Sequence, residues 1–471
     1  MLLLFLCQAA TAAAGQLPKI VIDELKRAQI PLSSVAIVVQ RSDAKSPLLA
    51  KNASRAMNPA STMKLLTTYA ALEMLGPAYQ WRTEAYLDGT LAEGVLEGNL
   101  VFKGYGDPKL TIEQFWLWLR ELRQRGLREI HGDIVLDRSF FEGIEHDPAE
   151  FDGDPTRAYN VGPNALLLNF NALRLRLVPG AAQAEALLEP NLSGYEIKNY
   201  ITTTDDQPCR GGDNYTARLE ERSIVLEGAL PTNCGEVDDY FSLLSHDEYF
   251  FAVFRSLWEE LGGTLQGTLR EGRAPAEQVA FSIWQSRSLL EAIRDINKFS
   301  NNIMARQLFL TLGAAGGYPA SIERSVAEIT QWLGTQQLEF PELVLENGAG
   351  LSRRERISAQ HLADLLRRAA RSPYSAELES SLPILGMDGT MKKRLKDDGI
   401  AGYAHIKTGM LEGVKSIAGY IHAGDGKKWI VVFIINHPNA LRGQASQDAM
   451  IKWVQMRLPE QAGVRLTQAG E

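Results

Sequence analysis

Residues 59–75 read Pro-Ala-Ser-Thr-Met-Lys-Leu-Leu-Thr-Thr-Tyr-Ala-Ala-Leu-Glu-Met-Leu, and Gly76-Pro77 follows. After Pro59 the stretch has no glycine or proline and is rich in apolar residues, which predicts a buried helix from Ser61 to Leu75. Ser61 and Lys64 are three residues apart, so they would lie on one face of its first turn. The pattern S-x-x-K is short and common, and its meaning depends on what accompanies it.

A serine and a lysine on one helical turn can serve as nucleophile and base. A serine hydroxyl attacks a carbonyl only when a neighbouring base takes its proton, and a lysine can do so only when its amine is neutral. Burial beside an apolar helix, with a second cation nearby, would lower the pKa of Lys64. The backbone N–H of Ser61 would lie at a helix start, where an oxyanion could be bound. The alternative is that Ser61 is a plain N-cap and Lys64 a solvated lysine.

A second polar motif, Ser300-Asn301-Asn302, lies between two predicted helices, 289–299 and 303–312. A polar loop between apolar helices suits a segment that points into a cleft. Ser300 could relay a proton to a leaving amine, and Asn302 could hold a substrate carbonyl or orient Lys64. The alternative is a helix–helix connector with an asparagine cap.

A third motif, Lys407-Thr408-Gly409, lies in a predicted strand, 404–411. Two further strands, 415–422 and 429–436, and a helix, 446–457, are predicted to follow, and 429–436 is apolar on both faces, as an inner strand would be. Gly409 would let an extended peptide approach the strand edge, and Lys407 and Thr408 could bind the carboxylate that ends the peptide. The alternative is an exposed edge guarded by a lysine.

The motifs S-x-x-K, S-x-N and K-T-G occur here in one order, and in this combination the chain resembles a class C low-molecular-mass penicillin-binding protein, a D-alanyl-D-alanine carboxypeptidase/endopeptidase. Ser61 and Ser300 are much farther apart in the sequence than in the compact β-lactamases. The likeness extends from about Pro31 to Pro438. Supporting stretches are Leu75-Gly76-Pro77, Gly106-Asp107-Pro108, Gly132 to Asp137, Gly348 to Arg353 and Gly386 to Thr390.

The resemblance implies a fold class and a division into domains. The fold class is α/β (α+β), with a β-lactamase/transpeptidase-like domain, an antiparallel sheet flanked by helices, interrupted by a large insertion that forms two smaller, mostly β and α/β domains. The expected boundaries are 1–15 for a signal peptide, 16–82 and 284–471 for the catalytic domain, 83–97 and 147–283 for an inserted mostly-β domain, and 98–146 for a nested small α/β domain.

The resemblance also implies a mechanism. Neutral Lys64 takes the proton of Ser61, and Ser61 attacks the carbonyl of the penultimate D-alanine. Ser300 passes a proton to the departing amine, Asn302 holds a substrate carbonyl or orients Lys64, and Lys407 tunes the local potential. Water then releases the acyl group, no cofactor is needed, and β-lactams mimic the substrate and stall at the acyl-enzyme.

Further substrate contacts are carried over from the family. Its members bind the diamino-acid end of the peptidoglycan stem with an aspartate and an arginine that match Asp154 and Arg353, with Tyr159 as an aromatic wall. An aspartate and an arginine suit a zwitterionic head, although both could equally be surface charges. Relatives usually have Ser or Thr after K-T-G. Met410 stands there, so one hydroxyl is missing, but its backbone N–H remains suited to an oxyanion hole.

Length, net charge and the N-terminal segment indicate where the protein acts and which partners it does not bind. The chain has 471 residues, enough for about three domains. A net charge of −8 argues against nucleic acid and against adhesion to anionic lipid. The apolar start, Met1–Leu6, and the small residues at 10–14 predict an export signal, although no basic segment precedes them. We expect a protein of the periplasm or cell wall without a transmembrane anchor, acting on stem peptides and acylated by β-lactams.

Removal of the signal would leave two cysteines, Cys209 and Cys234. An even count in an exported protein makes a disulfide between them a candidate, and two inert thiols are the alternative. The seven histidines show no ligand spacing, so no metal is expected. His405 is interpreted as a strand residue.

Two other functions share these features. A serine β-lactamase would have the same three motifs but should be shorter and should carry a deacylating base. Glu342, in Phe340-Pro341-Glu342-Leu343, superficially resembles such a base but reads as part of a loop before a strand. A catalytically idle wall-binding or sensor module is the other alternative, and the intact Ser61 and Lys64 argue against it.

Overall fold

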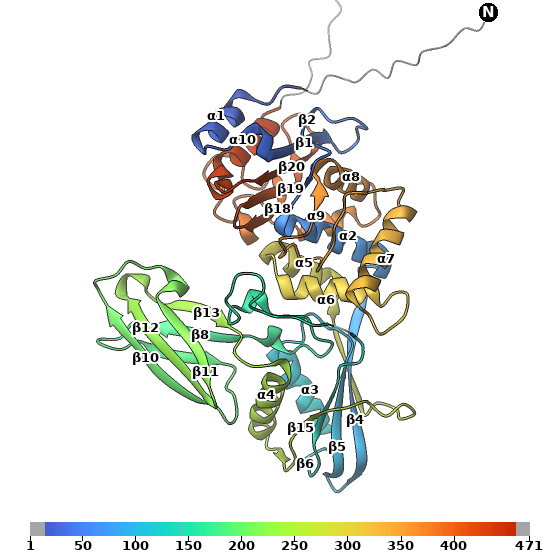
Figure 1. Ribbon diagram of the computed structural model, residues 1–471. Coiled ribbons are helices and arrows are strands. Elements are labelled where there is room, and N and C mark those ends of the chain that lie inside the picture. The colour runs from blue at the N-terminus through green and yellow to red at the C-terminus, as the bar shows by residue number, and fades with distance from the viewer. Residues whose placement is uncertain (1–14, 143, 458–471) are drawn as a thin grey trace, which may run out of the picture.

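The computed structural model describes residues 15–142 and 144–457. The two ends of the chain form one body, at the top of Figure 1, and the middle of the chain forms the rest. The predicted signal peptide, 1–15, lies outside the described residues except for Gly15. Among the helices that are described, none has both the length and the apolar character needed to cross a lipid bilayer.

The body formed by the chain ends is built on a five-stranded sheet in which every pairing is antiparallel, as the sequence predicts. The central strand is the apolar segment near residue 430, which is why both of its faces are apolar. In sheet order the strands are β18 (Ala404–Leu411), β19 (Val414–His422), β20 (Lys428–Asn436), β1 (Val35–Arg41) and β2 (Leu49–Lys51).

Successive side chains of the inner strands enter two different apolar cores, because they point to opposite faces of the sheet. In β1, Ile37 packs with helices α1 (Lys19–Arg27) and α10 (Gln444–Gln455), whereas Val38 packs with the helices on the other face. That second layer consists of α2 (Lys64–Leu75), α5 (Leu289–Phe299), α6 (Asn302–Gly313), α7 (Ile322–Thr335), α8 (Ala359–Ala369) and α9 (Ser375–Ser381).

The predicted helix from Ser61 to Leu75 begins as a 3₁₀ turn, Ala60–Met63, before the α-helical part starts at Lys64. Ala60 has a positive φ of 47°, and Thr62 donates to the Pro59 carbonyl from its N–H at 3.3 Å and from its hydroxyl at 2.7 Å. These contacts tighten the first turn. Gly76, with a φ of 81°, ends the helix where predicted.

The chain leaves this body after α2 and builds a seven-stranded mixed sheet at the bottom of Figure 1. Two helices, α3 (Ile112–Gln124) and α4 (His246–Glu260), pack on it through an aromatic core that includes Phe102, Trp118 and Phe254. The strands are β4 (Gln80–Ala92), β5 (Val95–Gly104), β6 (Glu129–Ile130), β7 (Ile134–Asp137), β14 (Thr264–Leu265), β15 (Leu269–Glu271) and β16 (Ser282–Ser288).

A third body, at the left of Figure 1, consists of two three-stranded sheets formed by residues 173–241. One has the order β10-β12-β11 and the other β13-β8-β9. Their strands are β8 (Leu173–Val178), β9 (Glu185–Glu189), β10 (Glu196–Thr204), β11 (Tyr215–Glu220), β12 (Ser223–Pro231) and β13 (Val237–Phe241); a separate pair is formed by β3 (Ala56–Met57) and β17 (Ile357–Ser358).

These sheets divide the insertion differently from the expected boundaries. The segment expected as a nested domain, 98–146, shares its sheet with β4 and with β14 to β16, because the β4–β5 hairpin runs across the boundary placed at residue 97. The β-rich residues 173–241 form the separate pair of sheets instead. In the sequence, the two three-stranded sheets are therefore inserted between strands of the seven-stranded sheet. The residues at which the domains begin and end stay a prediction.

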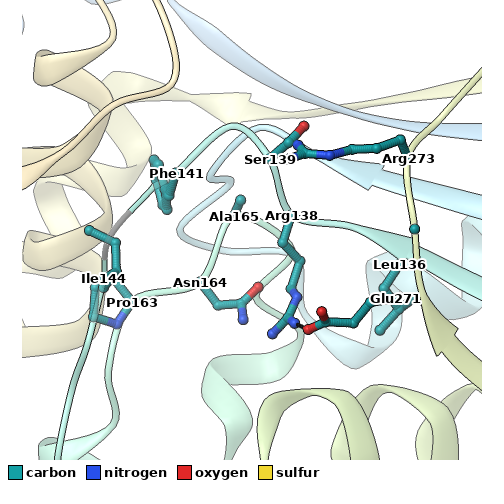
Figure 2. Close-up of a pocket in the computed structure, with 11 residues that line it drawn as sticks. Leu136, Arg138, Ser139, Phe141, Ile144, Pro163, Asn164, Ala165, Glu271 and Arg273 are labelled. Carbon is teal, nitrogen blue, oxygen red and sulfur yellow. Dashed lines mark ion pairs between the residues drawn. The ribbon is translucent and has the colours of Figure 1, made fainter. Parts of the chain in front are cut away.

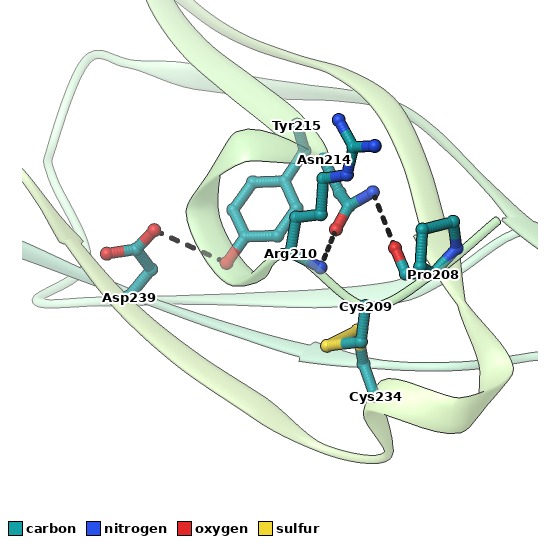
Figure 3. Close-up of a disulfide and its surroundings, with 7 residues drawn as sticks. All are labelled: Pro208, Cys209, Arg210, Asn214, Tyr215, Cys234 and Asp239. Carbon is teal, nitrogen blue, oxygen red and sulfur yellow. Dashed lines mark hydrogen bonds between the residues drawn. A yellow bond between two sulfur atoms is a disulfide. The ribbon is translucent and has the colours of Figure 1, made fainter. Parts of the chain in front are cut away.

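The candidate disulfide is formed: Cys209 and Cys234 are bonded, with their Cα atoms 5.2 Å apart. Figure 3 shows it beside a short loop in which the Arg210 N–H donates to Asn214 Oδ1 at 2.6 Å. Tyr215, at the start of β11, donates from its hydroxyl to Asp239 of β13 at 3.3 Å. The bridge therefore joins the loop before β11 to the turn after β12.

Removing the bridge with Cys209→Ser/Cys234→Ser should weaken this body and leave the body formed by the chain ends intact. Closing a loop with a sequence separation of 25 residues stabilises the folded state by roughly 3 kcal/mol. We expect faster proteolysis within residues 173–241 and an unchanged rate of proteolysis in the body formed by the chain ends. The control is the wild-type protein with dithiothreitol, which should behave like the variant. Equal proteolysis rates for oxidised wild type and variant would contradict the prediction.

Candidate active site

The fold brings the three sequence motifs together at one pocket of 730 Å³. Ser61 comes from the turn before α2, Ser300 and Asn302 from the junction of α5 and α6, and the K-T-G segment from the edge strand β18. The pocket is lined by Ser61, Phe151, Tyr159, Ser300, Asn302, Leu351, Thr390, Lys393, Arg394, Thr408, Gly409, Met410, Leu411, Lys415, Ser416 and Gln444.

Lys64 is fully buried, and its Nζ lies 3.0 Å from the Ser61 hydroxyl, 2.7 Å from Asn302 Oδ1 and in contact with the Ala349 carbonyl. Burial lowers the pKa of Lys64 well below its usual value, and the charge of Lys407 lowers it further. A neutral amine has two N–H donors and one lone pair. The two carbonyl oxygens can take the donors, which leaves the lone pair for the Ser61 O–H. The contacts thus suit a general base.

A buried carboxylate, which sequence reasoning missed, holds the segment that supplies the Ala349 carbonyl. Glu355 is fully buried, and its Oε1 accepts backbone N–H groups of Glu346, Asn347 and Gly348 at 3.1, 3.0 and 3.0 Å. Burial raises the pKa of Glu355, and the three N–H donors oppose that rise. Its charge raises the pKa of Lys64. No local pattern around Glu355 indicates these contacts, because they form only when the loop folds back.

Lys407 forms a second buried contact across the pocket. Its Nζ donates to Ser300 Oγ at 2.9 Å and to its neighbour's carbonyl, Thr408 O, at 2.8 Å. Burial lowers the pKa of Lys407 to about 7. Ser300 is held in the left-handed region, with φ 58° and ψ 35°, at the end of α5. The serine hydroxyl is thus presented to the pocket with a cation behind it, as a proton relay requires.

The third motif approaches the nucleophile closely. A Cβ atom added to Gly409 would lie 2.9 Å from the Ser61 nitrogen and 2.8 Å from the Pro59 carbonyl, so only glycine fits at this point of β18. The next residue, Met410, is 63 % exposed. Thr408 donates from its hydroxyl to Thr390 Oγ1 at 2.8 Å, a contact that the sequence does not suggest.

Of the three residues expected to bind the diamino acid, only Tyr159 lines the pocket that contains Ser61. Tyr159 lines the pocket and donates from its hydroxyl to Asp152 at 2.7 Å. Asp154 is outside the pocket lining and accepts from Arg157 Nε at 2.8 Å. Arg353 is half-exposed, donates to the Glu412 carbonyl at 3.0 Å and lies 4.9 Å from the Phe151 ring.

Glu342, the candidate deacylating base, points elsewhere. Its carboxylate accepts the Ser358 backbone N–H at 2.8 Å and contacts His361 Nδ1 at 2.7 Å, at the start of α8. It is absent from the lining of the pocket that contains Ser61. Glu342 therefore contacts residues at the start of α8, and it precedes the isolated β-bridge between Val344 and Arg356.

The histidines are less scattered in space than in the sequence. His405 of β18 and His422 of β19 lie near Glu379, and the potential ligand atoms of the three lie within 4.8 Å of one another. The Glu379 carboxylate already contacts His422 Nε2 at 2.6 Å and the Lys428 ammonium at 2.5 Å. Because an ammonium neutralises the carboxylate, we interpret the group as a structural ion cluster.

A second pocket, of 440 Å³, lies beside the seven-stranded sheet (Figure 2). Arg138 pairs there with Glu271 and reaches Asp247 at 3.1 Å, and Arg273 lies 3.7 Å from Asp137. Its lining includes no residue of the three motifs. Of these two pockets, only the larger one contains residues of the three motifs.

Comparisons with known proteins agree with this geometry. The chain is 26 % identical over 412 residues to D-alanyl-D-alanine carboxypeptidase DacB of Haemophilus influenzae, covering 86 % of this chain and 85 % of the relative. It is 26 % identical over 460 residues to a D-alanyl-D-alanine carboxypeptidase of an Actinomadura species, covering 91 % and 81 %.

The fold is also similar to a solved structure. The crystal structure of penicillin binding protein 4 from Haemophilus influenzae matches with a TM-score of 0.77 at 23 % identity, covering 93 % of this chain and 99 % of the other. The family model described as the D-Ala-D-Ala carboxypeptidase 3 (S13) family matches residues 19–457. Since that match spans nearly all of the described residues, the chain belongs to the D-Ala-D-Ala carboxypeptidase 3 (S13) family.

Proposed function

We propose that the chain is a serine-type D-Ala-D-Ala carboxypeptidase of peptidoglycan stem peptides, and that β-lactams acylate its serine. The observation that carries the proposal is the 3.0 Å contact between the Ser61 hydroxyl and the buried Lys64 amine. Membership of the family supports the class of reaction. The same chemistry would cleave D,D cross-links between stem peptides, so DD-endopeptidase activity is part of the proposal.

The roles of the residues follow from their contacts. Lys64, neutral because it is buried, takes the Ser61 proton as the hydroxyl attacks the carbonyl of the penultimate D-alanine. Asn302 holds the Lys64 amine in place. The departing amine takes a proton from Ser300, and the proton that Lys64 received passes back to Ser300 as the terminal D-alanine leaves, while Lys407 tunes the local potential through its 2.9 Å contact with Ser300. Lys64, neutral again, then takes a proton from the water that attacks the acyl carbonyl and returns it to the Ser61 oxygen, which releases the shortened peptide and restores the enzyme.

The contacts also weigh against the two alternatives. A β-lactamase needs a base beside the acyl-enzyme, and Glu342 is engaged at the start of α8 instead. An idle binding module has no use for two buried lysines, because desolvating an amine is costly unless it serves the function. We also propose that the protein is exported to the periplasm or cell wall, where its substrate lies. The oxidised cysteine pair supports this location.

Benzylpenicillin should add one acyl group per chain, on the peptide that contains Ser61. Mass spectrometry of the intact and digested protein measures this. Ser61→Ala should abolish labelling while the fold remains, since it removes the hydrogen bond with Lys64, and one such bond contributes about 0.5–1.5 kcal/mol. The matched control is Ser300→Ala, which keeps the nucleophile and should still be labelled, more slowly.

Two results would overturn these assignments. A label on Ser300, or an unmodified wild-type protein, would exclude Ser61 as the nucleophile. Rapid loss of the adduct with many turnovers of penicillin would favour the β-lactamase alternative, whereas we expect the adduct to persist for minutes.

We further propose that Asp154 and Arg353 bind the ammonium and carboxylate of the diamino acid in the stem peptide. Tyr159, in the pocket lining, supports the approach of the peptide from this side. Asp154 would have to exchange its contact with Arg157, and Arg353 its contact with Glu412, for the substrate. Such remote contacts position the scissile bond and can be used in the transition state.

Asp154→Ala and Arg353→Ala should each lower kcat/KM for a muropeptide with that diamino acid about tenfold, equivalent to about 1.4 kcal/mol. Acylation by benzylpenicillin, which lacks the diamino acid, should barely change. The control is Arg354→Ala, because Arg354 is a neighbouring exposed arginine that pairs with Glu346 at 3.1 Å. Equal losses on both substrates would mean that the residues support the fold and do not select the substrate.

A further inference from the structure

A turn outside the three motifs forms part of the wall of the active-site pocket. Residues Gly389–Met391 form a short 3₁₀ turn, and Thr390 lines the pocket with its side chain exposed. Its Oγ1 lies 2.8 Å from Thr408 Oγ1. Two hydroxyls from separate segments therefore stand side by side next to β18.

The position of Thr390 is fixed by an ion pair between a buried lysine and a partly exposed aspartate. Lys298, which is 4 % exposed and lies two residues before Ser300, donates to Asp388 Oδ2 at 2.6 Å. The other oxygen of Asp388 accepts the Ile384 backbone N–H at 2.7 Å. A Cβ atom on Gly389 would lie 2.4 Å from the Lys298 carbonyl oxygen, so the turn packs closely against the end of α5. The turn is thus held on the same element that presents Ser300.

The charge around Thr390 suits an anion. The lining of the pocket contains Lys393, Arg394 and Lys415 and no aspartate or glutamate. Arg394 is paired with Asp448, whereas the exposed Lys393 has no ion pair among the described residues. A carboxylate entering here would meet uncompensated positive charge, which attracts it from a distance.

The residue that follows Gly409 cannot supply a hydroxyl. Met410 is an exposed thioether with no O–H donor. Thr408 has one O–H, and a carboxylate has two oxygens that each accept hydrogen bonds. Thr390 offers a hydroxyl directly beside that of Thr408, with the two oxygens 2.8 Å apart.

We infer that Thr390 is a specificity-determining residue that, together with Thr408, donates a hydrogen bond to the carboxylate on the leaving side of the scissile bond. On binding, the carboxylate replaces the contact between the two hydroxyls and accepts one O–H from each. Lys393 adds long-range attraction. The inference rests on the proposed function, since it names the contact by which the same site recognises a free peptide end.

The test compares an acylated tripeptide ending in D-Ala-D-Ala with the same peptide ending in a carboxamide. Wild type should cleave the acid with a much higher kcat/KM than the amide. Thr390→Val, which keeps the shape and removes the hydroxyl, should lower kcat/KM for the acid about tenfold, mainly through KM, because a hydrogen bond to a charged group is lost. Cleavage of the amide should fall much less, because a neutral carboxamide oxygen accepts a weaker hydrogen bond than a carboxylate does.

Two matched variants control for structural effects. Thr390→Ser keeps the hydroxyl and should retain the preference for the acid. Thr390→Val/Met410→Thr places a hydroxyl at the next position of β18 and should recover part of it. Lys393→Gln should weaken cleavage of the acid at low salt, and the difference from wild type should shrink as salt screens the charge.

Stoichiometric labelling of each variant by a saturating β-lactam separates the two levels of the proposal. If the variants are labelled but Thr390→Val lowers cleavage of acid and amide equally, or changes neither, the role of Thr390 is overturned. A wild type that does not prefer the acid would overturn it as well. If wild type itself is not labelled and cleaves neither peptide, the proposed function fails.

Discussion

The buried amine of Lys64 is the contact on which the rest of the site depends. It contacts two carbonyl oxygens and one hydroxyl, and no carboxylate of residues 15–142 and 144–457 lies within hydrogen-bonding distance of it. Such an environment disfavours the ammonium form and favours a neutral amine. Each of the three contacts comes from a different segment: the turn at Ser61, the start of α6 at Asn302 and the loop at Ala349. The packing that buries Lys64 is therefore also the packing that assembles the site.

The long insertion between α2 and α5 does not disturb the contacts of Lys64, because the chain leaves the catalytic body and returns to it at neighbouring positions. Strands β4 and β16, which carry the chain away and back, pair with each other, and Gln80 lies opposite Ser288. At the base, the Leu289 N–H donates to the Tyr79 carbonyl at 2.7 Å. Helices α2 and α5 can thus pack as direct neighbours although the whole insertion lies between them in the sequence. This explains how Ser61 and Ser300 share a pocket despite their wide separation along the chain.

The sequence was sufficient to predict the elements that carry the motifs, because each has a strong local signal. The strand at 404–411 and the helix at 289–299 were predicted with the bounds that the structure has. The nesting of the insertion was not predictable in the same way, because short strands carry little information on which partner they pair with. The small strand β14, for instance, pairs with β6 across a long stretch of sequence.

The site residues likewise divide into those that a sequence motif identifies and those that only the structure identifies. Ser61, Lys64, Asn302 and Lys407 could be named from their motifs, and the structure brings them together. Glu355 was missed, because a carboxylate that binds backbone N–H groups leaves no pattern in the sequence. Thr390 lies in a stretch that supported the resemblance, but its contact with Thr408 could not be read from the sequence. For Asp154 the sequence could suggest a charge of the right sign, but its contact with Arg157 depends on the local turn and was not foreseen.

The most direct test of the account is the pKa of Lys64. NMR of protein labelled at the lysine Cε carbon would follow the titration, with the signal assigned by its absence in Lys64→Met. We predict a midpoint well below the usual lysine value of about 10.4, because the amine is buried beside Lys407. The Lys407 signal, assigned in the same way, should titrate at about 7. A Lys64 midpoint at or above the usual value would mean that the amine is charged at neutral pH and cannot take the Ser61 proton, which would contradict the mechanism.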